Sequence, residues 1–412
     1  MGDPPKYLSR YAGETVRRAM KVSPVVVLMG PRQTGKSTLV RTEPFLAHHL
    51  YLTLDDLDVR DRAATRPDDL LRSAPRIVLD EVQREPDLIL AIKRAIDSDR
   101  PRVPGRFVLT GSSNLLLMQR ISETLAGRAS YINLWPLTRR EKLGLGTTGI
   151  WSDLLNHKVS QWYDIARSET LGPAHWRREA AIGGYPTPAV EIAGDDLRTI
   201  WFDGYVRTYL ERDLQDLAAI DNLPDFRRLM KAASLRLANL LNQAELGRDT
   251  GIPRPTVQRY LNLLETSFQL IRLEPYSVNR TKRLIKSPKV FWSDTGLALH
   301  LAGDPTPSGP HLENLVLSDL LAWRDGQIPR PEILYWRTAS DLEVDFVIES
   351  GRKLIPIEVK ATAKPGLKDI RGLVAFRDEY PDHFSGGLLL HDGDEIQWLS
   401  DRILSVPWHR VV

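Results

Sequence analysis

The stretch that decides the fold is VVVLMGPRQTGKSTLVR, residues 25–41. It begins with five consecutive apolar residues, which indicates a strand covered on both faces, as in a parallel α/β sheet. The loop that follows, Gly30 to Ser37, matches G-x-x-x-x-G-K-[ST] in full, and the next residues, TLVR, can open a helix. This order of strand, glycine-rich loop and helix predicts a phosphate-binding site at the carboxyl end of the first strand.

Each fixed position of this loop has a chemical reason. The glycines let backbone N–H groups curl around a phosphate, Lys36 reaches the β- and γ-phosphates, and Ser37 offers an oxygen to Mg²⁺. We therefore predict that the chain binds ATP together with Mg²⁺. The predicted nucleotide-binding residues are Gly30, Pro31, Arg32, Gln33, Thr34, Gly35, Lys36, Ser37 and Thr38.

Two later apolar runs predict the rest of this site. The run IVLD ends in Asp80, which we expect to hold the Mg²⁺ shell, and Glu81 follows as the group that polarises the attacking water. The run FVLTG leads to Asn114, a candidate sensor of the γ-phosphate, because ligands of open α/β sheets bind at the carboxyl ends of strands. Arg128 is a candidate arginine finger, which would neutralise transition-state charge in its own subunit or in a neighbouring subunit. The alternative is an ordinary surface arginine.

Composition narrows the class of protein. The chain has 412 residues, which predicts two to four domains, and its 42% hydrophobic and 26% charged residues indicate folded cores. A net charge of +3 means that any nucleic-acid surface must be local. The absence of cysteine excludes disulfides, thiolate zinc sites and a cysteine nucleophile, and it fits a reducing compartment. Without a long apolar run or a signal-peptide core, we expect a cytoplasmic protein with no membrane partner.

The middle of the chain predicts helices followed by a DNA-binding pattern. Residues 243–265, QAELGRDTGIPRPTVQRYLNLLE, give two helical stretches joined by a glycine turn, and the apolar run FQLIRLEPY follows them. Helix, turn, helix and strand is the pattern of a winged helix-turn-helix. A cluster of Pro and Gly at 303–310 then indicates a boundary before a separate α/β unit.

Basic side chains gather in this pattern. The expected recognition helix begins near Arg254, and residues 272–289 form the clearest basic run of the chain. We predict DNA or RNA as partner, while a winged helix used only for packing between domains remains the alternative. The predicted contact residues are Arg254, Thr256, Gln258, Arg259, Lys282, Arg283 and Lys286.

A constellation of carboxylates and a lysine marks the C-terminal unit. Glu358 and Lys360 alternate along one strand and so share a face. A tight turn between Gly351 and Arg352 would join two antiparallel strands in which the numbers of paired residues add to 703. Asp345 then lies opposite Glu358, because 345 and 358 add to 703. The two carboxylates can therefore hold a common Mg²⁺ or Mn²⁺. The alternative is an exposed hairpin with one salt bridge. Glu313 lies in a preceding helical stretch.

Eight motifs in order resemble a prokaryotic family of AAA-type ATP-binding proteins with a DUF4143-type C-terminal region. They are GPRQTGKST, IVLDEVQ, LTGSS, LAGR followed by LWPLT, GGYP at 183–186, WFDGYVRTYLERD at 201–213, RLIKSPKVFWSDTGLA at 283–298, and EVDF with IEVK. The ATPase part resembles the additional-strand, catalytic-glutamate class, which implies a parallel sheet in the order 5-1-4-3-2. The C-terminal part resembles the PD-(D/E)XK nucleases, which implies that Asp345 and Glu358 bind metal, Lys360 orients or activates water, and Glu313 assists.

We therefore expect an α/β multidomain chain. Its parts are a P-loop AAA-type ATPase domain at 1–145, a helical linker region at 146–230, a winged helix-turn-helix at 231–302 and a PD-(D/E)XK nuclease-like domain at 303–412, with the DUF4143 region at about 200–360. The expected function is Mg²⁺-dependent ATP hydrolysis coupled to nucleic-acid binding and metal-dependent cleavage. Two alternatives stay open: a nucleotide-gated regulatory module whose nuclease-like domain is inert, and a toxin or defence factor restrained by ATP.

Overall fold

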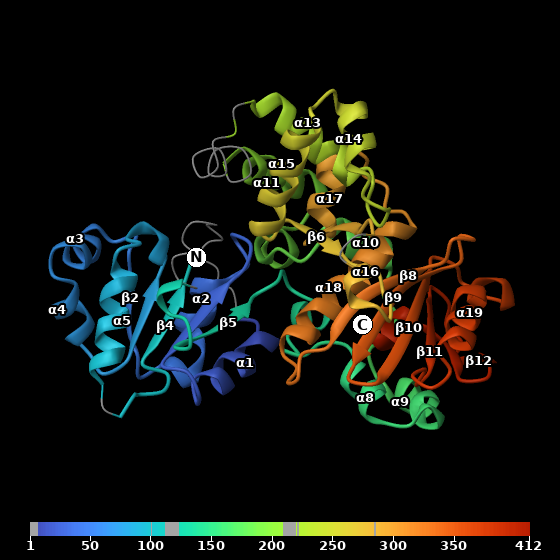
Figure 1. Ribbon diagram of the computed structural model, residues 1–412, viewed down its shortest axis with the longest axis horizontal. Helices are drawn as coiled ribbons and strands as arrows, with labels where there is room; N and C mark the ends of the chain where they lie inside the picture. The colour runs from blue at the N-terminus through green and yellow to red at the C-terminus, as the bar shows by residue number, and fades with distance from the viewer. Residues whose placement is uncertain (1–6, 100, 112–122, 209–219, 221, 284–285) are drawn as a thin grey trace.

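The computed structural model describes residues 7–99, 101–111, 123–208, 220, 222–283 and 286–412. Three parts follow one another along the chain (Figure 1): an N-terminal α/β part, a helical middle part and a C-terminal α/β part. Among the described residues, none of the helices has the length and apolar character needed to cross a membrane.

A five-stranded sheet forms the N-terminal part. Its order is β2-β3-β4-β1-β5 and every pairing is parallel, which confirms the expected order 5-1-4-3-2. All residues of β1, β3 and β4 are buried because helices cover both faces of the sheet. The strands are β1 Val25–Met29, β2 Leu50–Thr53, β3 Ile77–Asp80, β4 Phe107–Thr110 and β5 Ala129–Asn133. The helices are α1 Tyr11–Ala19, α2 Lys36–Thr42, α3 Leu57–Thr65, α4 Pro67–Arg72 and α5 Leu88–Ser98.

The middle part is helical and ends in two antiparallel strands. Asn242 caps the helix before the predicted turn, and Gly251 adopts a left-handed conformation that ends it, so the sequence signals of that turn are confirmed. The helices are α7 Arg139–Lys142, α10 Trp176–Ile182, α11 Asp195–Tyr205, α13 Leu223–Ser234, α14 Gln243–Thr250, α15 Arg254–Thr266, α16 Arg280–Arg283 and α17 Thr295–Ala302. Strands β6 Leu270–Leu273 and β7 Lys289–Trp292 pair so that Leu273 lies opposite Lys289.

A six-stranded mixed sheet forms the C-terminal part, in the order β12-β13-β11-β10-β9-β8. Ile357 pairs with Phe346, so the predicted register in which partner numbers add to 703 is confirmed. The strands are β8 Glu332–Arg337, β9 Glu343–Ser350, β10 Lys353–Lys360, β11 Gly387–His391, β12 Gln397–Ser400 and β13 Ile403–Pro407. The helices are α18 Gly309–Asp325, α19 Arg371–Glu379 and α20 Trp408–Val411.

Two helices from the expected linker region also pack on this sheet (Figure 1). They are α8 Trp151–Asn156 and α9 Trp162–Ser168, and they lie beneath the C-terminal strands in the view of the figure. Trp162 is fully buried and shares a core with Leu388 and Leu404. An apolar side chain early in the linker thus completes a core with strand residues that come more than 220 residues later.

Helix α18 ties the three parts together through buried polar side chains. Asn314 accepts a hydrogen bond from the Trp292 N–H at 3.0 Å and donates one to the Trp292 carbonyl at 2.8 Å, so it binds β7. Asp319 accepts from the backbone N–H of Gly149 at 2.8 Å. Asp325, at the end of the helix, accepts from Trp135 Nε1 at 2.9 Å, just after β5.

We expect Asn314→Leu to lower the free energy of unfolding by about 2–4 kcal/mol, because it leaves two buried backbone groups of Trp292 without partners. Ser318→Ala, on the same helix, removes a hydroxyl that donates to its own helix backbone and should change stability by less than about 1 kcal/mol. Urea unfolding of both variants measures the difference. Equal stability of the two variants would contradict the role assigned to Asn314.

Candidate functional site

The glycine-rich loop lies between β1 and α2 and has the backbone shape of an anion cradle. Gly30 has φ 139°, Gln33 has φ 62° and Gly35 has φ 88°. A side chain at Gly30 would meet the carbonyl oxygen of Leu134, the residue that follows β5, at 2.2 Å. The close approach of this neighbouring segment therefore requires glycine at position 30. The left-handed residues turn successive N–H groups toward the inside of the loop.

Lys36 is folded onto its own loop. Its ammonium is buried and donates to the carbonyl oxygens of Gly30 at 3.0 Å and Pro31 at 2.6 Å. Burial lowers the pKa of Lys36 to about 8. The loop thus holds the cation in the position that the predicted role requires, and a phosphate would replace the two carbonyls as its partner.

Two acidic residues stand at the carboxyl end of β3, beside the loop. Asp80 accepts hydrogen bonds from the hydroxyls of Ser37 at 3.0 Å and Tyr51 at 2.5 Å, and from that of Thr110. Glu81 follows with φ 60°, a conformation that is uncommon for residues other than glycine. The structure therefore brings Lys36, Ser37, Asp80 and Glu81 together, as the sequence predicted.

A cavity of about 160 Å³ opens next to the loop. The cavity lies on the side of the loop where α2 begins. Gly35 and Thr38 line the cavity on that side. No motif predicted its other walls, which are Tyr7, Leu8, Arg10, Leu137, Pro186, Val190 and Glu191.

The two remaining candidates of this site are Asn114 and Arg128. Asn114 lies outside the described residues. Arg128 precedes β5, at the edge of the sheet opposite the loop, since Val25 pairs with Ala129 there. Its guanidinium pairs with both carboxylate oxygens of Asp97 at 2.8 and 3.0 Å. The position therefore does not support a finger in cis, and a role on a neighbouring subunit stays a prediction.

The predicted carboxylates of the C-terminal sheet do gather in one place. Glu358 forms an ion pair with Lys360 at 2.5 Å, and Asp345 accepts from the Val359 N–H at 2.9 Å. Glu313 of α18 reaches the same group. The sequence analysis missed two members, Glu343 of β9 and Lys289 of β7. We define the carboxylate cluster as Glu313, Glu343, Asp345 and Glu358 with Lys289 and Lys360.

Lys289 lies at the centre of the carboxylate cluster. Its ammonium lies 3.2 Å from Asp345 Oδ1 and 3.7 Å from Glu313 Oε2, and it also pairs with Glu343. Burial alone would lower the pKa of Lys289, but the surrounding carboxylates outweigh burial and raise it. Burial, with the neighbouring Asp345, raises the pKa of Glu358 to about 8 and that of Glu313 well above its usual value.

In this conformation the cluster does not fit a metal ion. Within the described part of the chain, no group of three or more His, Cys, Asp or Glu side chains is arranged to hold one. Asp345 is engaged by Lys289, while Glu358 is engaged by Lys360, so the two predicted ligands do not converge on a common cation. A metal shared by Asp345 and Glu358 therefore stays a prediction.

The predicted nucleic-acid residues divide into two groups. Arg254, Gln258 and Arg259 are exposed on α15, and Thr256 is half-buried on the same helix. Lys286 is exposed, and Lys282 lies in α16.

The prediction that Arg283 contacts nucleic acid is wrong, because its side chain is buried rather than presented to a ligand. It pairs with Glu349 at 2.6 Å and Glu332 at 2.8 Å and donates to the Ser277 carbonyl. Its charge fixes the connection between β6 and β7 to the C-terminal sheet. The basic run at 272–289 is therefore not one surface.

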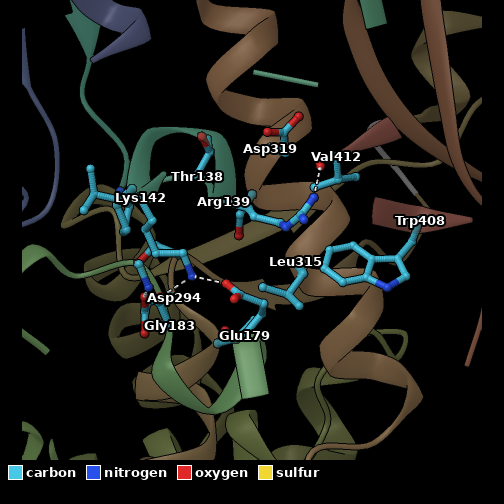
Figure 2. A pocket seen from close by; sticks show the side chains of 16 residues that line it. Thr138, Arg139, Lys142, Glu179, Gly183, Asp294, Leu315, Asp319, Trp408 and Val412 are labelled. Atoms are coloured by element: carbon cyan, nitrogen blue, oxygen red, sulfur yellow. Dashed lines mark hydrogen bonds and ion pairs between the residues drawn. The ribbon is translucent and has the colours of Figure 1, made fainter. Parts of the chain in front are cut away.

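A second pocket lies where the three parts of the chain meet (Figure 2). It has a volume of about 30 Å³, enough for one water molecule. Figure 2 shows Lys142 paired with Glu179 and bonded to the Gly183 carbonyl, and Arg139 bonded to the Val412 carbonyl. Lys142 and Glu179 thus pair with each other, while Arg139, Asp294 and Asp319 are bonded to backbone groups, and we interpret the pocket as a packing junction.

Three of the family-like motifs converge at this junction. The Leu137 N–H, of LWPLT, donates to the Gly184 carbonyl, of GGYP. The Gly184 N–H in turn donates to Asp294, of WSDTGLA. A side chain at Gly183 would meet the Asp294 carboxylate at 2.5 Å, and one at Gly184 the Leu137 carbonyl at 2.4 Å. These motifs are therefore explained by close packing rather than by chemistry.

The parallel sheet with its glycine-rich loop defines a protein of the P-loop ATPase type. A model of an AAA domain matches residues 22–143. Two domains of unknown function, DUF8612 and DUF4143, match residues 173–308 and 308–411. The DUF4143 match lies further toward the C-terminus than the interval of about 200–360 that we expected.

An uncharacterized protein of Mycobacterium tuberculosis is 30% identical over 412 residues, covering 98% of this chain and 84% of that protein, and one of Mycobacterium bovis matches equally. The chain belongs to the same family as these mycobacterial proteins. An uncharacterized protein of Methanocaldococcus jannaschii is 23% identical over 377 residues, covering 84% of this chain and 79% of that protein. Among solved structures, a Walker-type ATPase of Pyrococcus abyssi matches with a TM-score of 0.45 and 15% identity, covering 73% of this chain and 99% of that one.

Proposed function

We propose that the chain is a Mg²⁺-dependent ATPase. Its bound nucleotide controls the C-terminal half of the chain, which contacts nucleic acid. The single observation that supports this most is the hydrogen bond of 3.0 Å between Ser37 Oγ and Asp80, the two groups that hold Mg²⁺ in P-loop enzymes. Bound Mg²⁺ would supply charge neutralisation at the phosphates. ATP is the expected nucleotide, and the cavity beside Gly35 and Thr38 is the proposed place for its nucleoside.

The residues of the chain take separate roles in this proposal. The N–H groups of the glycine-rich loop and Lys36 bind the phosphates, and Asp80 orients the Ser37 hydroxyl. Glu81 stands one residue beyond Asp80 with a carboxylate able to polarise a water molecule for attack on the γ-phosphate. Gln83 donates to that carboxylate and orients it.

Glu81→Gln should lower the turnover number for ATP by about 100-fold or more, since it removes the general base but leaves the phosphate cradle intact. ATP affinity should stay within a few-fold. Lys36→Ala should lose both binding and turnover. Phosphate release and equilibrium binding of a fluorescent ATP analogue measure the two quantities, with Glu85→Gln as the matched control. Unchanged turnover in both Glu81→Gln and Lys36→Ala would rule the proposal out.

We propose α15 as the nucleic-acid contact of the middle part, in a winged helix-turn-helix arrangement. Arg254, Gln258 and Arg259 are exposed along one helix, and such side chains contact phosphates and base edges in complexes of this type. The alternative, in which this unit only packs between domains, draws support from the burial of Arg283 against the C-terminal sheet.

Arg254→Glu with Arg259→Glu should weaken binding of a DNA or RNA duplex at least tenfold at low salt and flatten its salt dependence, because both changes remove positive charge facing the phosphates. Arg283→Gln should instead lower the free energy of unfolding by about 2–4 kcal/mol, since it leaves Glu349 buried and unpaired. Fluorescence anisotropy and urea unfolding separate the two effects. Identical binding by the parent and the double variant would favour the packing alternative.

Metal-dependent cleavage is a second candidate function. The observation that favours it is the gathering of Asp345, Glu358 and Lys360 on neighbouring strands beside Glu313, the arrangement that the nuclease resemblance implies. Asp345 and Glu358 would hold Mg²⁺ or Mn²⁺, which would supply charge neutralisation at a scissile phosphate. The competing proposal is an inert module, since a fold can keep its acidic residues without turnover.

Asp345→Asn should abolish cleavage of end-labelled single- or double-stranded DNA or RNA by the parent protein in Mg²⁺ or Mn²⁺, while ATP hydrolysis persists. Asp341→Asn, an exposed carboxylate a few residues earlier, is the matched control. Assays with and without ATP show whether the nucleotide drives or restrains the reaction. Absence of cleavage in every condition, with ATP hydrolysis intact, would favour the inert module.

Assembly and location are further parts of this proposal. A finger role for Arg128 on a neighbouring subunit requires a homo-oligomer, and Arg128 would first have to leave its pairing with Asp97. We also propose that the protein acts in the cytoplasm, as its lack of cysteine suggests.

A further inference from the structure

One of the two cations of the carboxylate cluster, Lys289, comes from a different part of the chain than the carboxylates. Lys289 begins β7, within the segment that the DUF8612 model matches, whereas Glu313, Glu343 and Asp345 lie within the DUF4143 match. The Lys289 side chain is 3% exposed, so water does not share in neutralising it. A lysine so deeply buried requires partners of opposite charge, and these carboxylates provide them.

One ammonium does not satisfy the cluster. Lys289 pairs with Glu343 and Asp345, but Glu313 Oε2 stays at 3.7 Å and accepts no hydrogen bond. Glu358 is 7% exposed, and its Oε2 is buried without a donor. Two buried carboxylate oxygens thus lack a donor, and the two ammonium groups of Lys289 and Lys360 face four carboxylates, although such oxygens are normally satisfied. A divalent cation carries the extra charge and coordination that they lack.

Exchange of the two cations does not require the fold to open. The backbone of β7 is fixed, since Ala238 N–H donates to the Val290 carbonyl and Trp292 is bound by Asn314. The lysine side chain, by contrast, has a flexible four-carbon stem, and its ammonium is held by Asp345 and Glu343 and lies over the Tyr335 ring. Withdrawal of the ammonium thus requires the Lys289 side chain to break these contacts while the backbone of β7 stays in place.

We propose that Lys289 is a built-in competitor of the metal: its ammonium fills the cation position of the carboxylate cluster and keeps a divalent cation out until the side chain withdraws. This inference rests on the cleavage proposal above, because it concerns the same carboxylates. It explains why the residues expected to hold a metal do not converge in this conformation. It also makes the middle part of the chain a regulator of the C-terminal site.

The test measures Mn²⁺ binding to the full chain without nucleotide, by the loss of the free Mn²⁺ signal in electron paramagnetic resonance. Lys289→Gln should gain one Mn²⁺ per chain, bound at least tenfold more tightly than by the parent, because the competing charge is gone. Combining it with Asp345→Asn should remove this gain, which assigns it to the cluster. Lys364→Gln, the same change at an exposed lysine near β10, is the control and should bind like the parent.

Two results overturn the proposal. The first is equal Mn²⁺ binding at the cluster by the parent and Lys289→Gln, and the second is absence of binding in both. A gain of Mn²⁺ without cleavage of any nucleic acid would contradict the cleavage proposal alone and leave the competition standing. The two failures are therefore distinguishable.

A measurement on the parent guards against misfolding of Lys289→Gln, which is checked by its thermal unfolding. Acetylation of lysine amines, read by mass spectrometry, reports whether the ammonium is accessible. Excess Mn²⁺ should raise labelling of Lys289 severalfold relative to Lys364, since the displaced amine reaches solvent. Unchanged labelling of Lys289 across the Mn²⁺ titration would overturn the proposal without any variant.

Discussion

The structure depends on one helix, α18, whose buried polar side chains each bind a different part of the chain. Asn314 hydrogen-bonds to the backbone of Trp292 in β7, as a neighbouring strand would. Asp319 accepts from the Gly149 N–H, in the segment that follows the ATPase sheet, and Asp325 accepts from Trp135. Such groups are costly to bury unless they are paired, so their bonds fix the position of the helix as well as its neighbours. The three parts therefore cannot separate without breaking bonds at α18.

This constraint also connects the two candidate sites. Glu313, near the start of α18, belongs to the carboxylate cluster, and Asp325 ends the helix against the strand next to β1. Twelve residues of helix separate them, a distance of about 18 Å. One continuous helix therefore connects the edge strand β5 of the ATPase sheet to the cluster. Asn314 adds β7 to the same helix, and β7 carries Lys289.

Local signals predicted the nucleotide site, because its residues come from the ends of adjacent strands and from one loop. The register of β9 and β10 was equally predictable, since a tight turn at Gly351 fixes which residues face each other. The composition of the carboxylate cluster was not. Lys289 lies 56 residues before Asp345 in the chain, and no periodicity connects them. The packing of Trp162 on a sheet formed by much later strands was hidden for the same reason.

The basic run at 272–289 shows how charge along a sequence differs from charge on a surface. Arg272 pairs with Glu265, Arg283 with Glu349 and Lys289 with the cluster, so three of its cations are neutralised inside the protein. Each acidic partner except Glu265 belongs to the C-terminal part. A charge that is buried and paired contributes little to long-range attraction of a phosphate backbone. Attraction of nucleic acid to the middle part would therefore arise from the basic side chains that stay exposed, which include Arg254 and Arg259 on α15 and Arg280 and Lys286 of the basic run.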